Sequence, residues 1–184
     1  MTSAFRLQHT ATALRLGRVI AYPTEAVYGL GCDPLNQQAV YQLLNLKHRS
    51  PERGLILIAS EFEQLRPYIA NIDQSVRQKA LASWPGPNTW LFPAAASTPF
   101  WLTGRHNTIA VRITAHPVAR AICETAGMAI VSTSCNIEKH RPARTALEAQ
   151  IKCPRVDVIL HGSVDRHARP SVIRDLMTGT ILRS

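Results

Sequence analysis

A short cationic segment, Lys47 to Arg53, is the first part of the sequence whose residue types could do chemistry. Lys47, Arg49 and Arg53 fall within seven residues. An arginine binds phosphate oxygens through a planar fork of donors, and a lysine adds a compact point charge. The segment therefore suits a phosphate-bearing ligand. The alternative is that these cations only complement the dipole at the C-terminal end of a helix.

A run of small polar side chains, Ser132, Thr133, Ser134 and Asn136, is the second such feature. On a strand, Ser132, Ser134 and Asn136 would share one face, with Thr133 and Cys135 on the other. Small groups that donate and accept hydrogen bonds suit the wall of a ligand site, although a solvated strand end has the same composition. Cys135 faces away from them and has no evident histidine partner, so we do not expect a cysteine nucleophile.

Arg112 is the third feature, because it lies inside a segment, residues 108–113, whose apolar side chains alternate as in a strand. A buried guanidinium must meet an anion or reach solvent. A substrate carboxylate held by two parallel hydrogen bonds would satisfy it, and so would an internal salt bridge. The pattern leaves these two alternatives equal.

The elements that must position these residues follow from the spacing of apolar side chains and from turn residues. The sequence predicts helices over residues 9–16, 36–47, 73–83, 117–127 and from 145 onward. It predicts strands over residues 18–22, 54–59, 88–92, 108–113, 128–134 and 156–160, and a hairpin joining 171–174 to 180–183. Residues 23–34, with Gly29 and Gly31, are expected to form a loop. This order predicts one α/β domain over residues 1–184, a twisted mixed sheet flanked by helices.

Length, composition and charge limit the classes of protein to which the chain can belong. The 184 residues are 46% hydrophobic and 18% charged, which fits a folded domain and excludes a disordered tail. We find neither a signal peptide nor the roughly 20 apolar residues of a membrane span. Four scattered cysteines favour reduced thiols, so we expect a cytoplasmic protein. The net charge of +9 favours a polyanionic partner, a nucleotide or an RNA.

The common motifs for nucleotides and metals do not occur in the sequence. It contains neither the phosphate-binding loop G-x-x-x-x-G-K-[ST] nor the dinucleotide pattern G-x-G-x-x-G. A nucleotide must therefore be held in another way. The histidines lack metal-ligand spacing, so we assign no metal ligands.

Several motifs, taken in order along the chain, together resemble the YrdC/TsaC-like threonylcarbamoyl-AMP synthase family in its short bacterial form. They span residues 8–183 and are Ala21–Pro34, Lys47-x-Arg49 with Ser134-x-Asn136, Trp84–Pro87 with Thr89, Ala110–Arg112, and Pro170–Asp175. Each motif alone is weak evidence for the family, but the occurrence of all of them in this order is specific to it. The chain departs from the family at Ile137–Lys139, where a Ser-Gly pair usually follows.

The resemblance implies an α/β fold with a large, concave, positively charged cavity. It implies that L-threonine, bicarbonate or CO₂, and ATP give threonylcarbamoyl-AMP and pyrophosphate, with Mg²⁺ accompanying the ATP. This product serves the t6A modification of tRNA at adenosine 37. The expected partners are therefore proteins that transfer it, with tRNA or another RNA as a further contact and no membrane.

Carried over to the matching positions, the resemblance also implies the site residues. Lys47, Arg49, Ser134 and Asn136 would be catalytic. The ATP-binding residues would be Lys47, Arg49, Arg53, Thr108, Ser134 and Ser171. The threonine-binding residues would be Thr24, Arg112 and Ser132. Two alternatives stay open: an RNA-binding or ribosome-maturation factor without turnover, and an enzyme that transfers a carbamoyl group to another acceptor.

Overall fold

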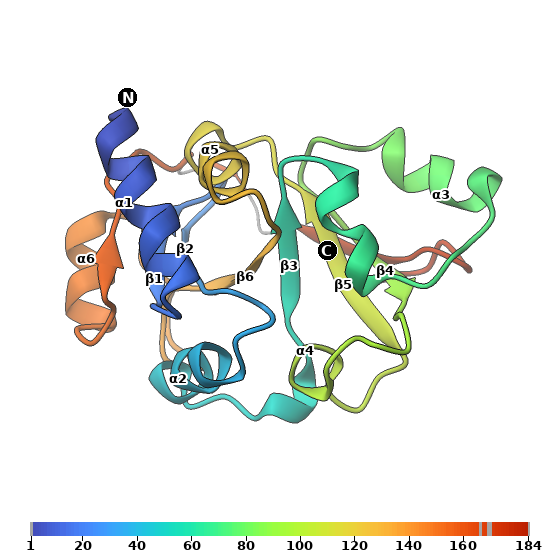
Figure 1. The fold of residues 1–184 in the computed structure, drawn as a ribbon, viewed down its shortest axis with the longest axis horizontal. Helices are drawn as coiled ribbons and strands as arrows, with labels where there is room; N and C mark the ends of the chain where they lie inside the picture. The colour runs from blue at the N-terminus through green and yellow to red at the C-terminus, as the bar shows by residue number, and fades with distance from the viewer. Residues whose placement is uncertain (1, 166, 169–170, 184) are drawn as a thin grey trace.

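The strands form one twisted sheet that runs across the molecule (Figure 1). The computed structural model describes residues 2–165, 167–168 and 171–183. The strands within these residues are β1 Ile20–Pro23, β2 Tyr28–Gly31, β3 Ile56–Ala59, β4 Asn88–Pro93, β5 Thr108–Ile113, β6 Ile130–Ser134, β7 Val158–Ile159, β8 Val172–Asp175 and β9 Ile181–Arg183. Their order in the sheet is β7-β1-β2-β6-β3-β5-β4-β8-β9.

The sheet is mixed, as the sequence predicts. β1 pairs with β7, β3 with β5, and β4 with β8 in parallel, whereas the other described neighbours are antiparallel. β6 pairs with β3 as far as Ser132 and with β2 at Thr133 and Ser134. The end of β6 therefore separates from β3, and this separation decides where the site lies.

Helices cover both faces of the sheet. The α-helices are α1 Ala4–Arg15, α2 Gln37–Lys47, α3 Gln74–Leu81, α4 Phe100–Thr103, α5 Pro117–Ala126 and α6 Ala146–Lys152, and the short 3₁₀ helices are η1 Pro51–Arg53, η2 Phe62–Gln64 and η3 Arg66–Tyr68. α1 and α5 lie side by side over one face (Figure 1), where Leu14 and Ile122 pack in one core cluster with Ile58. Leu57, the neighbour of Ile58 on β3, packs in the other cluster with Leu43 of α2. Alternate side chains of one strand thus enter two cores.

The predicted loop over residues 23–34 is wrong in its middle, because residues 28–31 are β2. Glycine usually marks a turn, and this composition hid the strand. Gly31 instead lies where the chain is tightly packed: a Cβ there would be 2.7 Å from the carbonyl oxygen of Val131 and 2.9 Å from the ring of Tyr22. The turn between β1 and β2 is thereby reduced to residues 24–27, closed by the hydrogen bond from Thr24 N–H to the Val27 carbonyl at 3.0 Å.

Most other predicted elements are confirmed, with shifted ends. α2 begins after Asn36, whose side chain accepts a 3.0 Å hydrogen bond from Ala39 N–H, as its capping pattern predicts. β5 has the predicted bounds, and β8 and β9 form the predicted hairpin. α1 begins earlier than residue 9, since Ser3 caps it through its side chain. Pro170 of the last motif lies outside the described residues.

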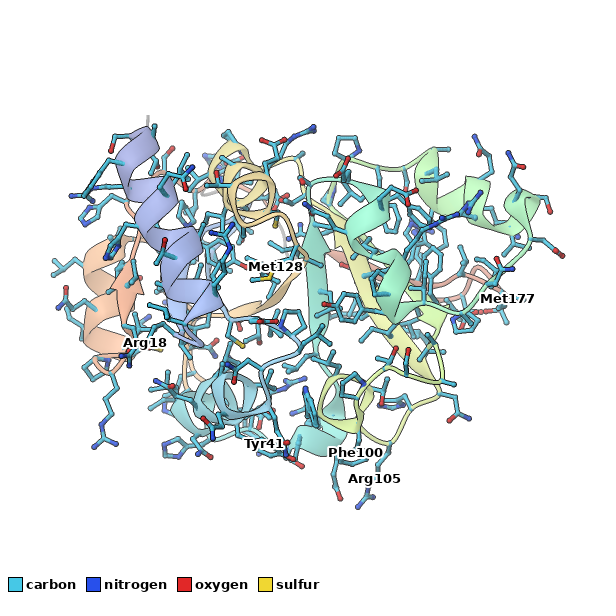
Figure 2. The ribbon with its side chains drawn as sticks, in the orientation of Figure 1. Arg18, Tyr41, Phe100, Arg105, Met128 and Met177 are labelled. Carbon is cyan, nitrogen blue, oxygen red and sulfur yellow. The ribbon has the colours of Figure 1, made fainter. Side chains whose placement is uncertain are left out.

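Side chains fill the space between the sheet and its helices, and charged groups extend at the periphery (Figure 2). Arg18 and Arg105 are two of these, and they pair with Asp157 and Glu52. Among the helices in the described part of the chain, none is long and apolar enough to cross a membrane.

Candidate functional site

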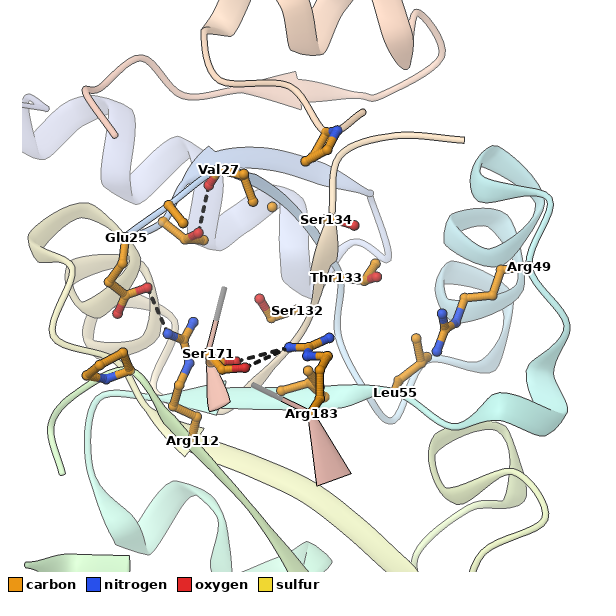
Figure 3. A pocket seen from close by; sticks show the side chains of 16 residues that line it. Glu25, Val27, Arg49, Leu55, Arg112, Ser132, Thr133, Ser134, Ser171 and Arg183 are labelled. Carbon is orange, nitrogen blue, oxygen red and sulfur yellow. Dashed lines mark hydrogen bonds and ion pairs between the residues drawn. The ribbon is translucent and has the colours of Figure 1, made fainter. Parts of the chain in front are cut away.

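A cavity of about 280 Å³ opens where the end of β6 separates from β3. Its wall combines the turn between β1 and β2, the end of β6, the start of β3, Arg112 on β5 and the C-terminal hairpin (Figure 3). The predicted site residues that line it are Thr24, Arg49, Arg112, Ser132, Ser134 and Ser171. The fold therefore brings residues from five separate segments to one ligand-sized space.

Arg112 and Glu25 form an ion pair inside this cavity. Nη1 of Arg112 donates to Oε2 of Glu25 at 2.8 Å, and Arg112 is 7% exposed. The internal salt bridge that the sequence left open is therefore present, while the buried Nε of Arg112 has no partner. Burial raises the pKa of Glu25, but Arg112 and the hydrogen bond from Thr114 outweigh it, so the pKa lies below its usual value. Glu25 stays ionised at neutral pH.

The hydroxyl groups of the wall are held by the strands beneath them. Tyr22 is fully buried, and its hydroxyl donates to Ser132 Oγ at 2.9 Å. With that lone pair occupied, the Ser132 hydroxyl can donate its own proton to a ligand. Thr133 also lines the cavity, although alternation predicts the opposite face for it. The reason is that β6 has already separated from β3 at this point, so the strand end is open to the cavity on that side.

Lys47 and Asn136 lie beneath the wall rather than in it. Lys47 is 2% exposed, and its Nζ donates to the carbonyl oxygens of Ser134 and Asn136, the latter at 2.9 Å. Asn136 Oδ1 accepts from Lys47 Nζ at 3.3 Å and from Ser134 Oγ at 2.5 Å. Burial, and then the charge of Arg49, lowers the pKa of Lys47 to about 8. The ammonium therefore fixes the chain between Ser134 and Asn136.

Arg49 is the predicted cation of this segment that lines the cavity. Its Nη2 donates to the Gly54 carbonyl at 2.9 Å, Nη1 lies 3.9 Å from Glu138 Oε1, and its buried Nε has no partner. Burial and the charges of Arg53 and Arg183 lower the pKa of Arg49. Arg53 is exposed and pairs with the same Glu138 carboxylate.

Two further predicted residues differ in their relation to the cavity. Thr108 stands at the start of β5, opposite Pro93, and does not line it. Ser171 does line it and accepts a 2.9 Å hydrogen bond from Thr89 Oγ1. The buried Cys135 thiol lies 3.9 Å from the Ala149 carbonyl, and its hydrogen bond with Cys153, followed by burial, raises its pKa. A thiol in that state is a poor nucleophile.

Sequence reasoning missed two charged residues of the wall, Glu25 and Arg183. Arg183 Nη2 donates to the carbonyl of Ser171 at 3.0 Å and to its hydroxyl at 3.3 Å (Figure 3). Burial, and then the charge of Arg112, lowers the pKa of Arg183. Nothing in the local pattern marks Arg183, since only the pairing of β8 with β9 places it beside Ser171.

The described wall is suited to anions and poorly suited to a metal ion. Its charged side chains are Arg49, Arg112 and Arg183 against Glu25, an excess of positive charge. The residues that the structure describes contain no group of three His, Cys, Asp or Glu side chains able to hold a metal ion. The Glu25 carboxylate is already engaged by Arg112 and Thr114. The chain's own side chains therefore do not fit a protein-held Mg²⁺.

The fold and this site define a mixed α/β domain with a cavity whose charged side chains are mainly arginines. The chain belongs to the Sua5/YciO/YrdC family, whose model carries the description "Telomere recombination" and matches residues 12–184. The predicted family resemblance is thereby confirmed.

Three comparisons show how far the similarity extends. A threonylcarbamoyl-AMP synthase of Alkalilimnicola ehrlichii is 52% identical, covering 100% of this chain and 97% of that protein. The protein of the same name from Methylococcus capsulatus is 50% identical, with 98% of each covered. The crystal structure of P. abyssi Sua5 complexed with L-threonine superposes with a TM-score of 0.89 at 29% identity. That match covers 97% of this chain but 53% of Sua5, so the chain spans about half of that protein.

Proposed function

We propose that this protein is an L-threonylcarbamoyladenylate synthase, a nucleotidyltransferase that uses ATP. It would condense L-threonine, bicarbonate or CO₂, and ATP into threonylcarbamoyl-AMP and pyrophosphate, for the t6A modification of tRNA at adenosine 37. The observation that carries the proposal is a sequence identity of about 50%, over nearly the whole chain, to proteins of that name. The arginine-lined cavity supports it, because the nucleotide, threonine and bicarbonate all carry negative charge.

Within the cavity we assign two neighbouring parts to the two larger substrates. Arg112 and the Ser132 hydroxyl would hold threonine by offering donors to its carboxylate. The Thr24 hydroxyl donates to the Val27 carbonyl at 2.6 Å, so it would serve threonine as an acceptor. Arg49 and Ser134 would meet the phosphates of ATP. Ser171 would contact the nucleotide from the C-terminal hairpin, and Arg183 would add a further cation there.

The four remaining predicted residues do not line the cavity, which supports other roles for them. Lys47 and Asn136 would act from below, by fixing the position of Ser134. Arg53 and Thr108 lie outside the cavity wall, so we propose for them contacts to the part of ATP that extends beyond it.

The chemistry can proceed without a covalent enzyme intermediate. The threonine amine forms a bond to the carbon of CO₂ and loses a proton to solvent, which gives a carbamate. A carbamate oxygen then bonds to the α-phosphorus while the bond to pyrophosphate breaks. Negative charge grows on the phosphoryl oxygens and on the leaving group, so the arginines and hydroxyl donors of the wall supply the main stabilisation. Mg²⁺ would enter with the phosphates of ATP.

The partners and location follow from the same proposal. The labile product would pass to proteins that transfer it to tRNA, and the net charge of +9 supports contact with RNA. All four cysteines are free and buried, which supports a reducing cytoplasmic location.

Pyrophosphate release from ATP, measured with and without L-threonine and bicarbonate, tests the proposal. We expect release that requires both compounds. RNA binding with a steep salt dependence and no threonine-dependent pyrophosphate would instead support a binding factor without turnover. Product formation from carbamoyl phosphate in place of bicarbonate and ATP would support carbamoyl transfer to another acceptor.

A further inference from the structure

Glu25 is the single acidic side chain among the described residues that line the cavity, and its two carboxylate oxygens have different partners. Oε2 accepts the hydrogen bond from Arg112 (Figure 3). Oε1 accepts from Thr114 Oγ1 at 2.9 Å and from Ala115 N–H at 3.3 Å. One side of the carboxylate is therefore attached to the chain just beyond β5, and the other side holds a guanidinium.

Thr114 is the anchor of this arrangement, although it does not line the cavity. It is fully buried, and its Oγ1 accepts a 3.2 Å hydrogen bond from His116 N–H. Because the backbone donor occupies a lone pair of the hydroxyl, the hydroxyl proton is directed to Glu25. Thr114, Glu25 and Arg112 thus form a chain of hydrogen bonds that begins in the core and ends in the cavity.

This chain has a consequence for the ligand of Arg112. Glu25 engages Nη1, whereas the buried Nε has no hydrogen-bond partner, so one donor of the guanidinium remains for a ligand to satisfy. An arginine that is held in one orientation before binding loses less rotamer freedom when the ligand arrives. A carboxylate beside an arginine can also have the opposite effect and weaken ligand binding, because it competes with the ligand for the guanidinium.

We propose that Glu25 is a positioning residue, anchored by Thr114, that holds the Arg112 guanidinium in the orientation that receives the carboxylate of L-threonine. This inference rests on the proposed function, because it takes L-threonine as the ligand of Arg112. Glutamine cannot replace Glu25: with its amide oxygen toward Thr114 and Ala115, its NH₂ group would face the donor of Arg112.

The test compares Glu25→Gln and Thr114→Val with two matched variants. Thr114→Ser keeps the anchoring hydroxyl. Thr10→Val makes the same chemical change at a buried threonine of α1, whose hydroxyl donates only within its helix, to the Arg6 carbonyl at 2.7 Å. For each protein we would measure L-threonine binding by isothermal titration calorimetry, the KM values for L-threonine and ATP, and the melting temperature.

We expect Glu25→Gln to weaken L-threonine binding about tenfold and Thr114→Val to weaken it about three- to tenfold, each with an ATP KM within about twofold of wild type. Thr114→Ser should bind L-threonine as the wild type does, and Thr10→Val should lower the melting temperature without changing L-threonine binding. Tighter binding by Glu25→Gln would overturn the inference, since Glu25 would then be a competitor. So would a Thr114→Val variant that binds as well as Thr10→Val. A wild-type protein without L-threonine binding and without threonine-dependent pyrophosphate release would overturn the proposed function as well.

Discussion

Replacing Lys47 with methionine separates two roles that a lysine in this motif can have. Methionine keeps an unbranched apolar side chain and removes the ammonium group. If Lys47 contacts the phosphates directly, the change weakens ATP binding. If it acts through its hydrogen bonds to the Ser134 and Asn136 carbonyls, the change displaces the Ser134 hydroxyl and leaves ATP binding largely intact. The structure favours the second role, because Lys47 is 2% exposed and does not line the cavity.

The size of the effect of Lys47→Met can be estimated for stability and for kcat. A pKa near 8 means that burying the charge of Lys47 costs about 3 kcal/mol, which methionine recovers. Each carbonyl left unpaired costs about 1–3 kcal/mol, so the net loss of unfolding free energy is at most about 3 kcal/mol. In a chain of this size the melting temperature should fall by about 12 °C at most. A displacement of the reacting groups by about 1 Å lowers kcat about a hundredfold.

The assay is pyrophosphate release at saturating L-threonine and bicarbonate over a range of ATP concentrations, combined with thermal melting. Lys47→Met should lower kcat about a hundredfold, with an ATP KM within about threefold of wild type. Lys79→Met, on an exposed position of α3, is the matched control and should behave as wild type. A large rise in the ATP KM with kcat preserved would refute the reasoning and show that Lys47 contacts phosphate directly.

The remaining predictions concern the same cavity. Arg49→Ala should raise the ATP KM and reduce pyrophosphate release at least about a hundredfold without unfolding the protein, and turnover near the wild-type rate would exclude a phosphate contact. Arg112→Ala should raise the L-threonine KM far more than the ATP KM, and equal changes would contradict a carboxylate site. Cys135→Ala should keep kcat within about twofold, since the hydrogen bond with Cys153 and burial raise the pKa of that thiol; an inactive but folded variant would indicate a nucleophile. As pH rises through about 8, the folded protein loses the Lys47 proton before the unfolded chain, whose value is near 10.5. The Lys47 contribution to the unfolding free energy should therefore rise over this range while kcat falls, and a pH–rate profile unchanged by Lys47→Met would contradict the assignment.

Local sequence patterns predicted the helices and most strands because their causes are local. Asn36 caps α2 with its own side chain, and Gly127 ends α5 in a left-handed conformation with φ of 71°. The alternation over residues 108–113 gives β5 its bounds and places Arg112 on the face opposite Val111. These features depend on neighbours within a few residues, and such neighbours are visible in the sequence.

The features that sequence reasoning missed depend on contacts between distant segments. The segment that contains Gly31 is a strand because it pairs with β1 and β6, and the carbonyl of Val131 and the ring of Tyr22 leave no room there for a side chain. Glu25 belongs to the site because β5 brings Arg112 and Thr114 to it. No local pattern contains these contacts.

The sequence by itself determined the family, the mixed α/β class and the identity of most groups in the cavity. The tertiary structure decided which of those groups face a ligand and which lie beneath them. Lys47 ends α2, and His48 follows it in a left-handed conformation with φ of 51°, so the chain turns between Lys47 and Arg49. Lys47 is thereby buried under Ser134, and Arg49 reaches the cavity that opens where β6 separates from β3. Residues two apart in one motif therefore differ in their relation to the cavity, because the direction of a side chain depends on the backbone turn and on strand pairing far away in the sequence.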